Sequence, residues 1–391
     1  MNTFNLGKPI NPRVQTAQVK TYFANKFVNS ATKSKTNNLL LFLKHFLSWT
    51  GLLDPSHENI RFRLLAVISK MIFTFVTLDI LAVYCLSQTQ IKELKTLFAY
   101  IIAYPLSLLS WHALYLKRRQ FEILLQKFQD ASLNLCRKSA NSFAFTLLST
   151  HVLFTILLTI YIIHEDPNFY SYGYKISDEY ARITFLGMKN FIYVLVYPTF
   201  TNSVVLLYGV LCLCLTAHIR QLTQEIERCP AELFDTSKQL EILKRKAKID
   251  DILGYIEDIF SFPTFTIIIA NLFIAASVIG IYLYTTEWYA YLISLYVERC
   301  IYFLNSLIYI IIPMWTAGGI PLEECKFREM FYKKAQSRMF SIGISEKPRL
   351  ARWLFAKPEF VFTGWNILSY RRSTMFAVVG TLVTYTVLTY M

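Results

Sequence analysis

The chain has 391 residues, of which 54 % are hydrophobic and only 17 % are charged. This composition is unusual for a soluble globular protein and is typical of a membrane protein. A net charge of +14 would suit a nucleic-acid partner, but the basic residues alternate with apolar stretches instead of forming one basic domain. We therefore expect a lipid bilayer as the surroundings and no nucleic acid as a partner.

Seven largely apolar stretches follow one another, each long enough to cross about 30 Å of hydrocarbon as a helix. The sequence therefore predicts an all-α membrane protein with seven transmembrane helices. More than 60 mostly polar residues precede the first stretch, which is unlike a signal peptide, so helix one is expected to act as its own insertion signal. The stretches are 64–86, 97–116, 142–164, 190–217, 259–284, 289–314 and 374–391.

The basic residues predict the orientation in the membrane. Of the 40 Lys and Arg residues, 33 lie in the N-terminal segment and in the loops after helices two, four and six, whereas 5 lie in the other three loops. The positive-inside rule then puts the N-terminus in the cytoplasm and, after seven crossings, the C-terminus outside the cell. The short, charge-poor loops would then be external, and a G protein is not expected as a partner.

The segments between the spans divide the chain into regions. Residues 1–63 predict a cytoplasmic N-terminal segment with an interfacial helix around "NLLLFLKHFLSWTGLL". Residues 64–314 predict a ligand-binding bundle of helices one to six, with a helical extension into the cytoplasm at about 218–258. Residues 315–373 predict a cytoplasmic helical linker, and 374–391 the last transmembrane helix.

The sequence carries no enzyme signature: a P-loop, an H-E-x-x-H motif and a G-x-S-x-G motif are all missing. His112, His151 and His164 stand alone on different spans, and the seven cysteines have no metal-binding or disulfide-framework spacing. We expect no enzyme activity, no cofactor and no metal.

Four charged residues fall inside the predicted spans: Lys70, Asp79, Glu298 and Arg299. Charges at membrane depth are costly and usually have a partner or a function. Lys70 lies near the cytoplasmic end, where it can extend to the surface, and an Asp79–Arg299 bond between helices one and six is a possible pairing. Two roles remain open for these charged residues: they pair with one another between helices, or they line a water-filled cavity that a ligand can enter.

Aromatic side chains gather in the outward halves of the spans, where some belong to the interfacial belt. Others should lie one to two turns deeper, where a phenol supplies stacking and one polar contact to a small organic ligand. Helix packing is the competing interpretation for each residue. The candidate ligand-binding residues are Tyr104, Tyr161, Tyr197, Tyr291 and Glu298.

One stripe of small, hydroxyl and flexible apolar side chains runs along the last span. It consists of Ala377, Thr381, Thr384, Leu388 and Met391, at positions i, i+4, i+7, i+11 and i+14. Such a stripe can serve helix packing through hydroxyl hydrogen bonds, or it can line a narrow pore. The stripe alone favours packing.

The chain resembles the insect gustatory receptors, which are related to the insect odorant receptors. The resemblance rests on seven spans with the N-terminus inside, a basic stretch before the last span, and the ending "FTGWNILSYRRSTMFAVVGTLVTYTVLTYM". The family signature closes with Thr-Tyr, five mostly apolar residues and Gln-Phe. Thr384 and Tyr385 match its start, whereas Met391 stands at the place of Gln.

The resemblance implies a ligand-gated cation channel built from four subunits, homomeric or heteromeric, and opened by a small-molecule tastant. It implies that the seventh helices line the pore, with Ala377, Thr381, Thr384, Tyr385, Leu388 and Met391 as pore-lining residues. It also implies a plasma-membrane location in a sensory dendrite. An odorant receptor subunit and, from a different class, a membrane transporter are the alternatives, and the ligand class, sugar or bitter compound, stays open.

Overall fold

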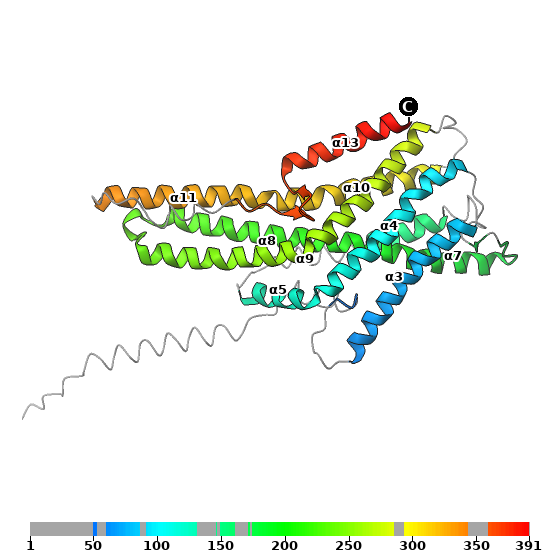
Figure 1. Cartoon of the computed structure of the whole chain (residues 1–391), viewed down its shortest axis with the longest axis horizontal. Helices are drawn as coiled ribbons and strands as arrows, with labels where there is room; N and C mark the ends of the chain where they lie inside the picture. Colours follow the sequence, from blue (N-terminus) through cyan, green and yellow to red (C-terminus); the bar gives the residue numbers. More distant parts are fainter. Residues whose placement is uncertain are drawn as a thin grey trace, which may run out of the picture.

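The structure is a computed structural model that describes residues 50–52, 60–86, 91–130, 146, 149–160, 171–172, 174–284, 293–342 and 359–390. In a few places inside the helices it describes the backbone alone, and Glu298 is one of these. Helices make up almost all of this part of the chain (Figure 1).

Apolar helices occur in each of the seven stretches predicted from the sequence. Five are long and apolar enough to cross a membrane: 64–86, 98–116, 179–228, 236–283 and 299–341. The segments Ser149–Ile160 and Arg372–Leu388 are apolar but shorter. The all-α prediction is thus confirmed in outline for the described residues, whereas seven crossings and the orientation of the termini stay predictions.

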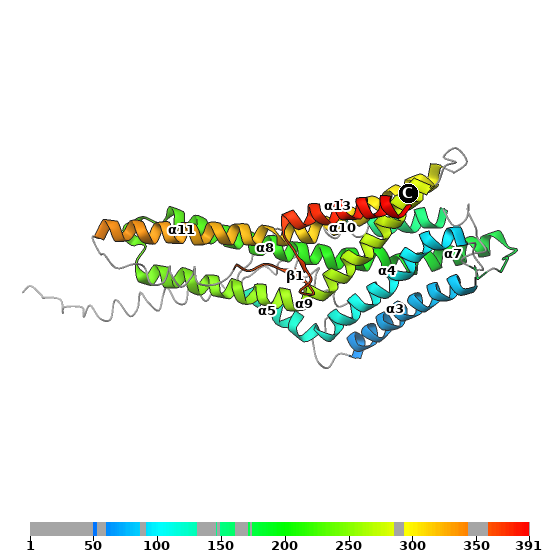
Figure 2. The ribbon, with the colours of Figure 1, turned by 45° about the horizontal axis from the view of Figure 1, so that its top comes forward.

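The first half of the chain forms four described helices: α3 (Ile60–Leu86), α4 (Ile91–Leu116), the short amphipathic α5 (Arg118–Asp130) and α7 (Glu179–Val194). In an elongated molecule, α3, α4 and α7 lie toward one end, and α5 lies nearer the middle beside α9 (Figures 1 and 2). Asp178 caps α7 by accepting a hydrogen bond from the Tyr180 amide at 2.9 Å, which satisfies one of the free N–H groups of the first turn.

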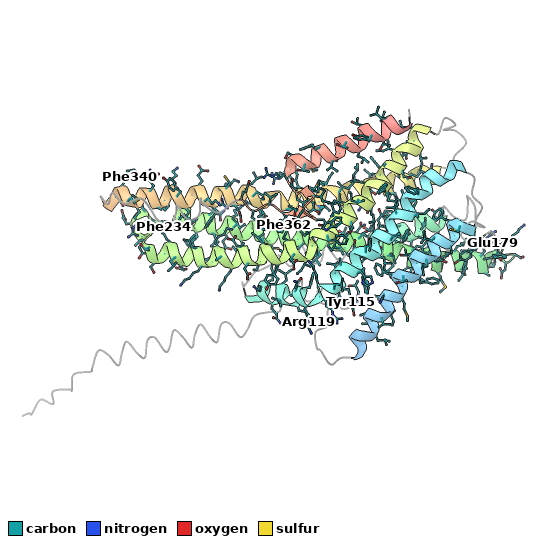
Figure 3. All side chains as sticks on the ribbon, in the orientation of Figure 1. Tyr115, Arg119, Glu179, Phe234, Phe340 and Phe362 are labelled. Carbon is teal, nitrogen blue, oxygen red and sulfur yellow. The ribbon has the colours of Figure 1, made fainter. Side chains whose placement is uncertain are left out.

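The longest helix of the second half is much longer than a bilayer is thick. A short π-helical segment, η2 (Leu195–Phe200), leads from α7 into α8 (Thr201–Arg228), and α9 (Thr236–Tyr284) runs for 49 residues, or about 73 Å at 1.5 Å per residue. After α10 (Ile293–Ala317), α11 (Gly319–Ile342) runs beside α8 and α9 toward the end of the molecule opposite α3 and α4, and Phe234 and Phe340 lie at that end (Figure 3). Residues 218–228 and 236–258 are helical, and their extension into the cytoplasm stays a prediction.

The path of α7 into α8 breaks at Tyr197, whose backbone angles (φ −143°, ψ 126°) are extended rather than helical. Tyr197 is nevertheless buried, and Pro198 follows it within the same segment. Proline lacks the N–H that a continuous helix would need, so it is compatible with a change of direction at this point. The predicted span 190–217 is therefore two helices joined by a bend.

A tight turn precedes α3. Gly51 has a positive φ of 71°, and a Cβ at this position would lie 2.4 Å from the Cα of Ala66. Only glycine suits this conformation and this close approach. The neighbouring Thr50 carbonyl accepts a hydrogen bond from the Trp111 indole at 3.0 Å, which ties the turn to α4. The rest of the predicted interfacial helix lies outside the described residues.

The sequence predicts a helical linker over 315–373. The described residues of this segment are helical only in part. After α11, two short antiparallel strands, β1 (Thr363–Gly364) and β2 (Leu368–Ser369), form a hairpin that leads into α13 (Arg372–Tyr390). Its turn includes Trp365 and Asn366, both with positive φ. Local apolar residues such as Phe362 and Tyr370 form this connection because they pack into the core instead of extending a helix.

Candidate functional site

Helix α13 packs with one face on α9 and α10 and leaves the other face uncovered. Met375, Leu382 and Thr386 are buried on the packed face. The described members of the predicted stripe, Ala377, Thr381, Thr384 and Leu388, are exposed on the uncovered face, and so is the further pore-lining candidate Tyr385. Met391 lies outside the described residues. Packing within the subunit, which the stripe alone favoured, therefore does not account for these side chains.

The N-terminal end of α13, which we call its foot, is connected to α9 by hydrogen bonds through the β1–β2 hairpin. The Glu257 carboxylate accepts a hydrogen bond from the Thr363 amide, at 3.1 and 3.2 Å to its two oxygens, and another from the Thr363 hydroxyl. One turn later on α9, Ser261 donates to the Thr363 carbonyl and accepts from the Trp365 amide, both at 2.9 Å. These bonds satisfy hairpin groups that would otherwise lack partners.

Tyr370 closes the same connection from the other strand. Its phenol is fully buried and forms a hydrogen bond of 2.9 Å with the Thr264 hydroxyl on α9. Burial raises the pKa of the Tyr370 phenol well above its ordinary value of 10.0, because the charged form would lose its hydration. Tyr370 is therefore neutral at physiological pH and acts as a fixed contact between the hairpin and α9.

Arg372 begins α13 beside the end of α10. Its guanidinium lies 4.4 Å from the centre of the Trp315 ring, a typical cation–π contact. The two backbone segments lie close together here, because a Cβ atom on Gly318 would be 2.9 Å from the amide nitrogen of Arg372. The α10–α11 junction and the foot of α13 therefore touch directly.

The predicted ligand-binding residues are only partly described. Tyr104 on α4 and Tyr197 at the break before α8 are both buried, and their ring centres lie 6.0 Å apart in an edge-on arrangement. Tyr193 approaches Tyr104 in the same way, at 5.8 Å. Tyr161 and Tyr291 lie outside the described residues, as does the side chain of Glu298. The structure thus brings two of the five together.

Asp79 has a partner that the sequence analysis did not name. Its carboxylate forms an ion pair with Lys189 on α7, with 3.1 Å between Nζ and Oδ2, and both side chains are buried. The hydroxyls of Tyr172 and Tyr193 also donate hydrogen bonds to Asp79. Burial and the bond to Asp79 raise the pKa of Tyr172 to about 12. Lys70, as expected, is exposed.

Sequence reasoning missed the buried amides of the bundle because it considered charges, phenols and hydroxyls but no asparagine. Asn202, Asn271 and Asn305 come from three different helices and are all buried. The available signal was an asparagine in the middle of each of three apolar stretches, since an amide at membrane depth also needs a partner. Among the described residues no group of three or more His, Cys, Asp or Glu could hold a metal ion.

Comparison with known proteins gives one consistent result. No family profile and no curated protein sequence matches the chain. The fold matches the olfactory receptor OR5 of the insect Machilis hrabei with a TM-score of 0.66 and 12 % identity, over 94 % of this chain and 98 % of that one. The same receptor in complex with eugenol matches with a TM-score of 0.63 and 13 % identity, over 90 % and 96 %.

The chain therefore has the fold of an insect olfactory receptor along almost its whole length. The resemblance to the insect chemoreceptors, which the sequence predicted from its spans and its ending, is confirmed at the level of the fold.

Proposed function

We propose that this chain is a subunit of an insect chemoreceptor of the gustatory class, a ligand-gated, non-selective cation channel. A small-molecule tastant binds in an outward-facing pocket of the bundle and opens a pore between subunits. The receptor crosses the plasma membrane seven times, with its N-terminus in the cytoplasm and its C-terminus outside.

The uncovered stripe on α13 carries this proposal. A transmembrane helix that exposed threonine hydroxyls to lipid would remove these polar groups from water without giving them a hydrogen-bond partner. A water-filled pore keeps them hydrated. Thr381 and Thr384 stand on that uncovered face, together with the phenol-bearing Tyr385. Four such helices around one axis would line a narrow pore with hydroxyl groups and close it with apolar groups such as Leu388.

The hairpin gives the pore helix a mechanical link to the bundle. The same α9 that holds the hairpin through Glu257 and Ser261 continues toward the outer part of the bundle. A ligand that shifts α9 or α10 would therefore move the foot of α13. The long α8, α9 and α11 helices would join the subunits on the cytoplasmic side, in a homo- or heterotetramer.

The choice between a gustatory and an odorant receptor rests on few residues. Thr384 and Tyr385 at the position of the gustatory signature favour a taste function. The two structures compared above are of one olfactory receptor, alone and in complex with eugenol, and this favours an odorant receptor as the second candidate. Both candidates are channels opened by small molecules.

Whole-cell current recording in a heterologous cell with G-protein signalling blocked tests the proposal. The cell is perfused with sugars, bitter compounds and volatile phenols such as eugenol. We expect a fast, cation-selective current with one ligand class, and no current in cells that express Thr384→Trp at an equal surface level. Saturable uptake without unitary currents would identify a transporter and overturn the channel function.

A further inference from the structure

A cluster of neutral polar side chains lies in the middle of the bundle, where α8, α9, α10 and the break before α8 meet. The asparagine cluster consists of Tyr197, Asn202, Asn271, Asn305 and Ser306. Asn202 Nδ2 donates to Asn305 Oδ1 at 2.9 Å, and the Tyr197 hydroxyl donates to Asn271 Oδ1 at 3.1 Å. All five side chains are more than nine-tenths buried.

The asparagine cluster contains hydrogen-bonding atoms that the described part of the chain does not satisfy. Asn202 Oδ1, Asn305 Nδ2 and Ser306 Oγ have no partner there. Ser306 Oγ lies beside the Tyr197 phenol without forming a hydrogen bond of ordinary geometry. Exchanging oxygen and nitrogen in both amides would preserve their mutual bond and again leave one carbonyl oxygen and one amide nitrogen free. The unsatisfied donor and acceptor are therefore a property of the pair.

Asn271 differs from the other two asparagines because it is satisfied. Its Nδ2 donates to the Ile267 carbonyl at 2.9 Å, and its Oδ1 accepts from Tyr197. The unsatisfied atoms thus lie on one side of the cluster, on α8 and α10. Buried polar groups without partners are costly, and native proteins rarely leave them empty.

The backbone at the cluster is also irregular. Tyr197 interrupts the helical path with extended angles at the point where its side chain reaches Asn271. At membrane depth, a broken helix occurs where protein buries it or where it lines a cavity. The break and the unsatisfied amides are independent observations, and both occur at the same place.

The surroundings of the cluster select for a neutral group. None of its five members is ionisable at physiological pH, and the Asp79 carboxylate is already held by Lys189 and two tyrosine hydroxyls. The Tyr104 ring, 6.0 Å from that of Tyr197, adds an aromatic wall. A hydroxyl group can donate one hydrogen bond, accept another and carry no charge, so it can satisfy both a free carbonyl oxygen and a free amide N–H.

We propose that the asparagine cluster is the polar subsite of the ligand pocket and that it binds the hydroxyl group of a neutral alcohol or phenol. Asn202 Oδ1 accepts the hydroxyl proton, Asn305 Nδ2 donates to the hydroxyl oxygen, and Ser306 adds a second polar contact. The apolar body of the ligand lies against Tyr104 and Tyr197. This inference rests on the proposed receptor function, because it names the ligand class of that receptor.

Matched probes test the subsite. Benzyl alcohol and 1-hexanol are each compared with their methyl ethers, which keep the apolar body and the oxygen, carry one additional methyl group and cannot donate a hydrogen bond. The full-length chain is studied in two ways: by whole-cell current and, after purification in lipid nanodiscs, by the shift of its melting temperature. We expect each alcohol to act at about tenfold lower concentration than its ether, which is the effect of one net hydrogen bond.

Two variants remove the subsite. Ser306→Ala deletes one oxygen atom, and the double variant Asn202→Leu with Asn305→Leu replaces both amides by apolar groups of similar size. We expect the alcohol-to-ether ratio to fall to about one in the double variant, which loses the acceptor of the hydroxyl proton, and to fall by a smaller factor in Ser306→Ala, which loses only the second polar contact. Ser107→Ala is the matched control, because Ser107 is an equally buried serine on α4 whose hydroxyl is satisfied by the Ala103 carbonyl at 2.8 Å. That variant should keep the ratio of the unmodified chain.

The outcomes separate the two proposals. An unchanged ratio in Ser306→Ala and in the double variant, or an equal loss in Ser107→Ala, overturns the subsite. Currents that do not distinguish alcohol from ether also overturn the subsite and leave the channel function standing. A melting shift that prefers the alcohol, in a chain that conducts no current, supports the subsite and overturns the channel function. No preference in either measurement overturns the subsite.

Discussion

Lys189 on α7 lies 3.1 Å from Asp79 on α3, and this ion pair is buried among aromatic rings. The Lys189 ammonium lies 4.1 Å from the centre of the Tyr172 ring, and the Tyr193 ring is 5.5 Å away. The pair therefore combines a charge partner with cation–π contacts. It joins the first helix of the bundle to the helix that leads into the Tyr197 break.

Replacing Lys189 by Met should destabilise the fold, because the buried Asp79 carboxylate would lose its cationic partner. Breaking one side of a buried pair typically costs about 3 kcal/mol. The check is thermal unfolding of the detergent-solubilised chain, in which the melting temperature should fall by several degrees.

The double variant Asp79→Asn with Lys189→Met should recover most of that loss, since it leaves no charge unpaired. Lys70→Met, a change of the same kind at an exposed position of α3, should leave the melting temperature unaltered. A melting temperature of Lys189→Met equal to that of the unmodified chain would show that the pair does not stabilise the fold.

Cysteine accessibility should distinguish the two faces of α13. Thr384→Cys should react with a cationic, water-soluble methanethiosulfonate reagent, and the current should fall by about tenfold as the pore is blocked. Thr386→Cys is the control, because Thr386 is buried and its hydroxyl bonds to the Leu382 carbonyl at 2.7 Å. Its current should persist. If neither cysteine reacts with the reagent, the stripe lies against lipid or another subunit.

Loosening the hairpin should weaken the link between ligand and pore. Glu257→Ala removes the carboxylate that accepts hydrogen bonds from the Thr363 amide and hydroxyl, and such charge-assisted bonds are worth about 2 kcal/mol. We expect the half-maximal ligand concentration to rise by about tenfold, with the unitary conductance unchanged because Glu257 is not on α13.

Glu241→Ala is the matched control for the hairpin, since Glu241 lies on the same α9 but pairs at the surface with Lys238. It should shift the dose response by less than about twofold, as surface pairs contribute little. A reduced unitary conductance in Glu257→Ala would instead assign this residue to the pore.

Tyr370 should make stability fall at high pH. Its pKa is raised by burial, so the folded chain keeps the phenol proton that the unfolded chain releases above pH 10. The contribution of Tyr370 is therefore complete below pH 10 and falls by about 1.4 kcal/mol per pH unit above it.

Tyr370→Phe isolates this effect. At pH 8 the variant should be about 1 kcal/mol less stable than the unmodified chain, because it loses the hydrogen bond to Thr264. At pH 11 the order should reverse, since phenylalanine has no proton to lose. Chemical denaturation at both pH values provides the check, and an equal difference at both would argue against a buried, neutral phenol.

The sequence by itself determined where the helices lie along the chain. An apolar run of membrane length is a local property of the sequence, and few structures other than a helix are compatible with it. The first span, predicted at 64–86, lies within α3 and coincides with the apolar part of that helix. The stripe on α13 was also accessible from the sequence, since helical spacing places residues on one face without reference to other helices.

Only the tertiary structure decided which residues meet. Asp79 pairs with Lys189, which the sequence placed outside the spans, and Asn202 meets Asn305 across 103 positions. Local patterns contain no information on such partners, because the rotation and depth of each helix are set by packing against its neighbours. The same packing covers Leu382 and leaves Thr384 exposed, and it thereby determined the face of α13 that can line a pore.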